Sequence, residues 1–195
     1  TGTVNFTPTN DAIYEGNETA TISISSVSGG DAYISGGTQF VVLTIIDDES
    51  APTVALSVSA TSIAENSGSS LTITATLSGK ADEDVTVTIG TGGTSTEGTD
   101  YTDGSGNLND ITISANSTTG TVTFTPTDDS VYEGSETAIV SIDGVSGADA
   151  SEDGTQSVTI TITDDESAPT VTLAVSDTTI AENAGSSLTL TATLS

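Results

Sequence analysis

The sequence predicts an all-β fold made of tandem antiparallel β-sandwiches. The first observation is that apolar and polar residues alternate with a period of two in several short segments. The second is that the opening residues recur about 118 positions later in the chain. Alternation of this kind indicates strands with one buried face. A long-period repeat indicates an array of structural units, so the fold is expected to be repeated along the chain.

The clearest strands are expected where an aliphatic face alternates with a face rich in Thr, at 71–77, 85–89, 121–125 and 158–162. Less regular strands are expected at 54–58, 111–113 and 138–142. Loops are expected at 90–98 and 103–110, which are rich in turn-forming residues. No long segment shows the helical period of 3.6 residues. About seven short strands in such a unit are typical of an immunoglobulin-like sandwich.

The repeat also divides the chain. Residues 50–53 and 167–170 share the sequence Ser-Ala-Pro-Thr, and each follows an acidic triplet and precedes an expected strand. We interpret both as short interdomain linkers. The chain is therefore expected to contain the C-terminal part of one unit at 1–50, a complete unit at 51–168 and the N-terminal strands of a further unit at 169–195.

The two partial units leave strand edges without partners. Even taken together, they contain no counterpart of residues 79–118. Exposed strand edges favour association with another chain. Either the chain is a window from a longer array, which is the interpretation we adopt, or neighbouring molecules complete the partial units.

The charge of the chain excludes several classes of partner. The sequence has 28 Asp or Glu residues, no His, and a single basic residue, Lys80, giving a formal net charge of -27. Binding to nucleic acid or to an anionic membrane needs Lys and Arg, so neither partner is expected. No apolar run approaches the roughly 20 residues that span a bilayer, and no membrane insertion is expected. Surplus negative charge opposes compaction unless a counter-ion relieves it, so a cation is expected as a partner.

Most of the acidic residues of the complete unit lie at strand ends and in loops. Nine of them are candidates for metal binding: Glu65, Asp100, Asp128, Asp129, Glu133, Glu136, Asp164, Asp165 and Glu166. Loops collect at the two ends of a sandwich, so acids that are distant in sequence can converge there. A site of oxygen ligands without nitrogen or sulfur favours Ca²⁺, which tolerates crowded carboxylate geometry better than Mg²⁺ does.

Five motifs in one order resemble the Calx-beta domain. They are Pro52-Thr53-Val54-x-Leu56, Ile63-Ala64-Glu65-Asn66-x-Gly68, Gly98-Thr99-Asp100-Tyr101, Asp128-Asp129-x-x-Tyr132-Glu133-Gly134-x-Glu136 and Ile162-Thr163-Asp164-Asp165-Glu166. The resemblance covers the complete unit and both partial units. It implies a β-sandwich. It also implies, by similarity to the Calx-beta domains of sodium/calcium exchangers, a site that binds several Ca²⁺ ions at one end.

By this resemblance the Ca²⁺ ligands would be Glu65, Asp100, Asp129, Glu133, Glu136, Asp164 and Asp165, with Asp128, Glu166 and the main-chain carbonyl of Val131 as further candidates. The partial units would contribute Asp11, Glu15, Glu18, Asp47, Asp48, Glu49 and Glu182. Asn10 stands where the complete unit has Asp128, which reduces the charge of the first site. Tyr101 and Tyr132, which lie beside these residues, are expected to pack in the core.

The function expected from these features is that of a calcium-binding extender segment in a large extracellular or cell-surface protein, similar to the Calx-beta arrays of bacterial adhesins. Neighbouring repeats of the same chain would be its partners, and adhesion ligands would bind elsewhere in the parent protein. One alternative is a module that binds glycan, mineral or protein, and another is an intracellular calcium sensor. No enzyme is expected, because the chain lacks His and Cys and the carboxylates are too crowded for a glycosidase pair.

Overall fold

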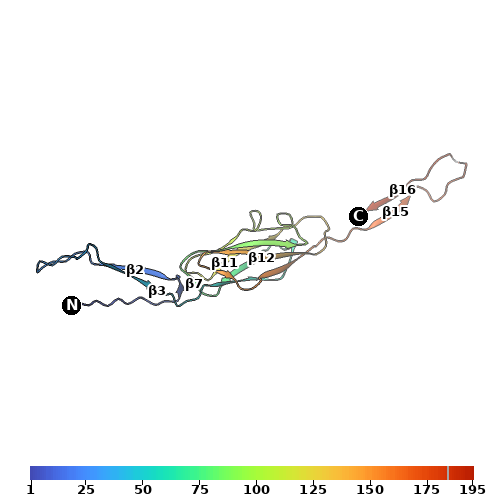
Figure 1. Ribbon diagram of the computed structural model, residues 1–195. Coiled ribbons are helices and arrows are strands. Elements are labelled where there is room, and N and C mark those ends of the chain that lie inside the picture. Colours follow the sequence, from blue (N-terminus) through green and yellow to red (C-terminus); the bar gives the residue numbers. More distant parts are fainter. Residues whose placement is uncertain (184) are drawn as a thin grey trace.

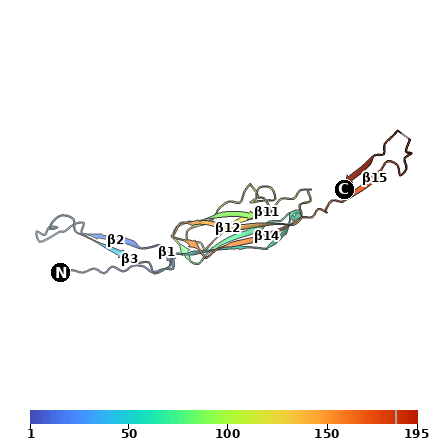
Figure 2. The ribbon, with the colours of Figure 1, turned by 45° about the vertical axis from the view of Figure 1, so that its right-hand side comes forward.

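A computed structural model describes residues 1–183 and 185–195. Its centre is a β-sandwich that runs from β4 (Thr53–Val58) to β14 (Ser157–Thr163). Two strand-containing extensions leave opposite ends of this sandwich, one at the N-terminus and one at the C-terminus, so the molecule is elongated (Figures 1 and 2). In the described part of the chain, no helix is long and apolar enough to cross a membrane.

The sandwich consists of two five-stranded sheets. In sheet order, the first contains β10 (Ile111–Ile113), β8 (Val85–Gly93), β12 (Glu136–Ser146), β14 (Ser157–Thr163) and β5 (Ser62–Ala64). The second contains β13 (Ser151–Glu152), β4 (Thr53–Val58), β6 (Leu71–Leu77), β11 (Thr119–Pro126) and β9 (Tyr101–Thr102). The long strands pair in antiparallel fashion, as predicted, whereas β5 and β13 add short parallel pairs to β14 and β4.

All seven predicted strands are present, and 71–77 and 111–113 match β6 and β10 to the residue. The loop predicted at 90–98 is wrong in its first part, because β8 continues to Gly93 through pairing with β12. The short strands β5, β9, β13 and β7 (Lys80–Ala81) were not predicted. Each of these strands has only two or three residues and lacks the Ile-Thr-Ile alternation that identifies β10, so the sequence pattern does not mark them.

The core follows from the alternation of side chains along each strand. In β6, Leu71, Ile73, Ala75 and Leu77 are buried, while the intervening threonines face outward or lie at intermediate depth. Tyr101 stacks on Phe124 with ring centroids 4.6 Å apart, so the core position predicted for Tyr101 is correct. The same prediction is wrong for Tyr132, which is 47% exposed. It lies in the loop between β11 and β12, outside both sheets.

The terminal extensions keep the strand register of the repeat. In the N-terminal hairpin of β2 (Glu18–Ser23) and β3 (Phe40–Ile45), Glu18 pairs with Ile45 as Glu136 pairs with Ile162. In the C-terminal hairpin of β15 (Val171–Val175) and β16 (Leu190–Leu194), Val171 pairs with Leu194 as Val54 pairs with Leu77.

Within the residues that the structure describes, neither hairpin is covered by a second sheet. Leu173 is 71% exposed, whereas its counterpart Leu56 is buried. Residues 1–10 form no strand, although their counterparts form β11, which is held in the sandwich by pairing with β6. The apolar faces that the repeat buries in the complete unit are therefore open in both extensions.

The N-terminal extension is tied to the sandwich by one further strand pair. β1 (Ile13–Tyr14) runs parallel to β7, with Ile13 opposite Lys80 and Tyr14 opposite Ala81. A strand from the first unit thus adds to a strand of the next.

Candidate metal centre

Acidic side chains from several segments of the complete unit meet at one end of the sandwich. Glu65 opens the 3₁₀ turn η1 (Glu65–Ser67), Asp100 immediately precedes β9, and Glu136 is the first residue of β12. Glu133 lies in the loop before β12, and the segment 164–166 follows β14. These segments converge because the strands that carry them reach the same end of the two sheets.

The carboxylates gather into two groups. One consists of Glu65, Asp165 and Glu166, and the other of Asp100, Glu133 and Glu136. Within each group, one oxygen of every residue lies within 4.8 Å of an oxygen of the others. Each group has the size of a cation site built from three carboxylates.

Asp164 connects the two groups. Its Oδ2 accepts hydrogen bonds from the backbone N–H of Glu133 at 2.7 Å and of Gly134, while its Oδ1 accepts from the N–H of Glu166 at 2.8 Å. Gly134 has a φ of 74°, in the left-handed region that favours glycine. This conformation allows successive N–H groups to face the carboxylate, which fixes the loop 133–134 against the end of β14.

Further hydrogen bonds also orient acidic side chains at this end. Asp129 Oδ1 accepts from the N–H of Val131 at 2.7 Å, and Asn66 Nδ2 donates to Asp165 Oδ2 at 2.6 Å. Asn66 was not predicted as a site residue. The available signal was its position directly after Glu65, which recurs as Asn183 after Glu182.

The crowding of these acids disturbs their ionisation. Burial, followed by the adjacent Glu166 carboxyl and the charge of Asp164, raises the pKa of Glu65 to about 7. Burial also raises the pKa of Glu136, with the neighbouring Asp100 carboxyl adding to the effect. The pKa of Glu133 is raised by burial and then by the charges of Asp100 and other nearby acids. All three groups are therefore held in surroundings that resist further negative charge.

Asp164 behaves in the opposite way. Partial burial alone would raise its pKa, but the backbone N–H groups of Gly134, Glu133 and Glu166 outweigh that effect and lower it. Asp164 is thus kept ionised at the centre of the cluster, beside groups that are pushed towards their protonated form.

The structure fits a hard cation at this position. Glu65 is only 9% exposed. In the described part of the chain, Glu65 Oε1 and Glu166 Oε2 are buried oxygens without a hydrogen-bond partner. Buried polar atoms without a partner are rare, and two such oxygens among clustered carboxylates are the arrangement that a bound Ca²⁺ would satisfy.

Outside the N-terminal unit, five predicted ligands lie outside both groups: Asp129 and Asp164, whose hydrogen bonds are described above, and Asp128, Val131 and Glu182. Asp128 is exposed, and Val131 contributes its N–H to the hydrogen bond with Asp129, so a ligand role for its carbonyl stays a prediction. Glu182 is also exposed, and none of the carboxylate groups found in the described residues includes it.

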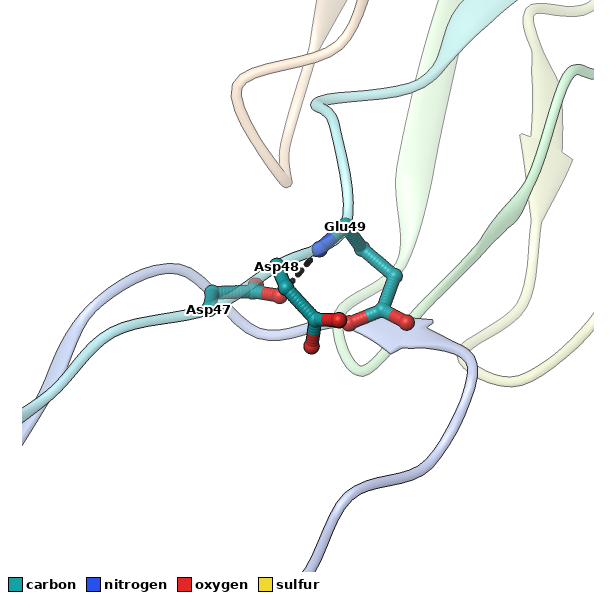
Figure 3. Close-up of side chains that lie close together, drawn as sticks. All are labelled: Asp47, Asp48 and Glu49. Carbon is teal, nitrogen blue, oxygen red and sulfur yellow. Dashed lines mark hydrogen bonds between the residues drawn. The ribbon is translucent and has the colours of Figure 1, made fainter.

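The N-terminal unit contains a second acidic cluster. Asp47, Asp48 and Glu49 form a group with oxygens within 4.8 Å, and in Figure 3 their side chains gather beside the strand β1. All six acids predicted for this unit line a cavity of about 100 Å³; they are Asp11, Glu15, Glu18, Asp47, Asp48 and Glu49.

The hydrogen bonds around Asp47 match those around Asp164 in the complete unit. Asp47 Oδ2 accepts from the N–H groups of Glu15 at 2.7 Å and Gly16 at 2.6 Å, and Asp47 Oδ1 accepts from Glu49 at 2.9 Å, the contact drawn as a dashed line in Figure 3. The N–H groups of Glu49 and Glu15 lower the pKa of Asp47. The loop geometry therefore belongs to the repeat and forms without counterparts of Glu65 and Asp100.

Comparison with known proteins agrees with the repeat. The model of the family described as the Calx-beta domain matches residues 1–49 and 47–166. A solved structure described as the apo form of the Calx CBD1 domain is similar at 19% identity with a TM-score of 0.47, and the match covers 58% of this chain and 99% of that chain. No curated protein matches the sequence. The family match extends over well more than half of the residues, and the chain belongs to the Calx-beta domain family.

Proposed function

We propose that the chain is a calcium-binding extender segment, in which each Calx-beta unit binds Ca²⁺ at the end that faces the following unit. The observation that carries this proposal is the pair of buried, unpartnered oxygens on Glu65 and Glu166. Ionised carboxylates in such surroundings require a counter-ion, and Lys80 is the one basic side chain in the sequence.

The residues that would hold the ion are those of the two carboxylate groups together with Asp164. Ca²⁺ takes about six to eight oxygen ligands and accepts irregular geometry, whereas Mg²⁺ requires a near-ideal octahedron. When bound, Ca²⁺ supplies the positive charge that removes repulsion between these acids.

The position of the clusters supports a structural role. The ligand segment 164–166 continues directly into residues 167–170, and the segment 47–49 continues into residues 50–52 before β4 begins. Fixing the acidic triplet restricts the chain that joins one unit to the next. An ion at each junction would therefore make the array stiffer.

The location that suits this role is outside the cell or at its surface. Extracellular calcium modules bind with dissociation constants of about 10⁻⁴ to 10⁻³ M, which fits an ion that is always present there. An extender of a large adhesin is the context that we propose. The dense negative charge would keep such arrays soluble and apart from one another.

Calorimetric titration of the chain with Ca²⁺ tests this function. Glu65→Gln is expected to weaken binding at the complete unit, because it removes a buried ligand. Asp153→Asn is the matched control, since it removes the same charge from an exposed turn at the opposite end of the sandwich. Binding stabilises the folded state by about 2.7 kcal/mol at 100 times the dissociation constant. Absence of binding at millimolar Ca²⁺, or equal binding by Glu65→Gln and wild type, would contradict the proposal.

A further inference from the structure

Tyr14 joins the first unit to the second through three kinds of contact. Its backbone lies in β1, which pairs with β7, and its carbonyl oxygen accepts a hydrogen bond from the N–H of Asp82 at 3.1 Å. Its hydroxyl donates to Asp149 Oδ2 at 2.8 Å. Its ring packs against the hydrophobic core of the sandwich. A single residue of the first unit therefore makes backbone, polar and apolar contacts with the second.

The loop that carries Tyr14 is also the acidic loop of the first cluster. Asp11 and Glu15, which line the small acidic cavity, lie on either side of Tyr14 in the sequence. A second cavity, of about 530 Å³, lies between the units and is lined by Tyr14, Glu15, Asp82 and Asp149 among others. The carboxylates and the docking residue thus share one short segment.

The surface that receives Tyr14 is strained. The turn 147–149 has φ angles of 94°, 50° and 49°, so Ala148 and Asp149 both adopt the left-handed conformation that side chains disfavour. A Cβ on Gly147 would stand 2.1 Å from the carbonyl oxygen of Asp84, so this turn lies directly against the segment that follows β7. Strained residues persist where the surrounding structure holds them, and they gather at sites that grip a ligand.

The same strained turn occurs in the first unit. Its residues 29–31 have φ angles of 85°, 62° and 53°, and Asp31 stands in the place of Asp149. The N–H of Ala32 bonds to the carbonyl of Gly29 as that of Ala150 bonds to Gly147. We call residues 80–84 and 147–149 the receiving surface. It lies at the end of the sandwich opposite Asp164, because β12 runs from Glu136 in the acidic cluster to Ser146 beside the turn.

We propose that the tyrosine of each acidic loop is a latch that docks onto the receiving surface of the following unit, and that cation binding by the loop promotes this docking. The coupling, but not the docking itself, rests on the proposed calcium binding. Docking places Glu15 in the lining of the same cavity as Asp82, Glu83 and Asp149, so negative charge from both units gathers at the joint. A cation held by the loop reduces that repulsion, and by linkage docking strengthens ion binding in return.

Tyr132 is the second copy of the latch. Its hydroxyl lies 3.8 Å from the position that a Cβ on Gly134 would take, and the corresponding distance from Tyr14 to Gly16 is 3.9 Å. Both rings thus fold over their glycine in the same way. Tyr132 remains 47% exposed. The repeat aligns Ser195 with Ser78, so the counterpart of the receiving surface is not among these 195 residues. The partner that Tyr132 fits is the receiving surface of a following unit.

Hydrogen exchange of the Asp82 amide in the full chain tests the latch, because that N–H is bonded to Tyr14. With Ca²⁺ in excess, Tyr14→Ala is expected to reduce protection of this amide at least tenfold. Tyr14→Phe, which removes only the bond to Asp149, is expected to reduce it less. Tyr132→Ala is the matched control, because it removes the same side chain from the second acidic loop, for which the receiving surface of a following unit is not among these residues. Protection of the β6 amides reports whether each variant keeps its sandwich.

The outcomes separate the latch from calcium binding. Equal Asp82 protection in wild type and Tyr14→Ala overturns the latch, even if calorimetry shows bound Ca²⁺. Protection that is the same with Ca²⁺ and with chelator, while calorimetry shows binding to the first unit, overturns the coupling. Failure of all binding overturns the proposed function, but the comparison of Tyr14→Ala with wild type still decides the docking.

An extended chain tests the second copy directly. Joining a copy of residues 79–168 after Ser195 continues the repeat in register and supplies a receiving surface to Tyr132. In this extended protein, Tyr132→Ala is expected to raise the hydrogen-exchange rate of the amide of the copied Asp82 at least tenfold. An unchanged exchange rate at that amide would overturn the general latch.

Discussion

The calcium affinity of the complete unit is expected to fall steeply between pH 8 and pH 6. Burial and the neighbouring Glu166 raise the pKa of Glu65 to about 7, and only the ionised carboxylate binds the metal. A group with this pKa is about 90% ionised at pH 8, about 50% at pH 7 and about 10% at pH 6. The apparent affinity should therefore fall by about tenfold across this range from Glu65 alone.

The folding stability of the metal-free protein should change with pH in the direction opposite to the calcium affinity. The folded-state pKa of Glu65 lies above the ordinary value of 4.5, so the folded state binds the proton more tightly than the unfolded state does. The resulting stabilisation is fully present below about pH 4.5 and is lost as the pH rises to about 7. With chelator, the melting temperature should therefore be higher at pH 5 than at pH 8, whereas bound Ca²⁺ should favour the higher pH.

Calorimetric titrations of wild type and Glu65→Gln at pH 6, 7 and 8 measure this effect. The variant should bind more weakly at pH 8, and its affinity should change less with pH, because the titrating group is gone. Two results would refute the reasoning. One is a wild-type affinity that stays constant from pH 6 to pH 8, and the other is an equally steep pH dependence in Glu65→Gln.

Three further substitutions test the fold and the supports of the site. Phe124→Ala removes a fully buried ring that stacks on Tyr101, and it should lower the free energy of unfolding in urea by about 3–5 kcal/mol with or without Ca²⁺. Gly134→Ala forces alanine to a φ of 74° at a cost of about 1–2 kcal/mol and should weaken calcium binding, whereas Gly154→Ala, with a φ of 68° in a distant turn, should leave binding unchanged in the same titration. Asn66→Ala removes the hydrogen bond to Asp165 and should lower calcium affinity by about tenfold, which calorimetry would show.

The long strands could be predicted because each carries a complete pattern of alternation. Leu71, Ile73 and Ala75 face one core, and the threonines between them face away. The bounds of β8 could not be predicted, because its last residues are glycines and threonine that pair with β12 without an apolar pattern of their own. These residues form a strand because they pair with β12. Residues 1–10 show the converse, since they repeat the β11 sequence but form no strand.

The acidic groups could be predicted as a set because the repeat preserved their order. Sequence could not show that Glu65 joins Asp165 and Glu166 while Asp100 joins a separate group, since this division depends on which strand ends lie side by side. Nor could it show the role of Tyr132. An aromatic residue beside ligands is usually a core residue, and only the contacts of Tyr14 with the next unit indicate another use.

Small-angle X-ray scattering of the full chain in millimolar Ca²⁺ and in chelator tests most directly whether the ion fixes one unit to the next. With Ca²⁺, a single extended shape with a long, well-defined maximum dimension is expected. With chelator, a broader distribution and a smaller average radius of gyration are expected, because the first unit then moves about residues 50–52. Identical scattering in both conditions, with calcium binding verified by calorimetry, would contradict the role of the ion in stiffening the array.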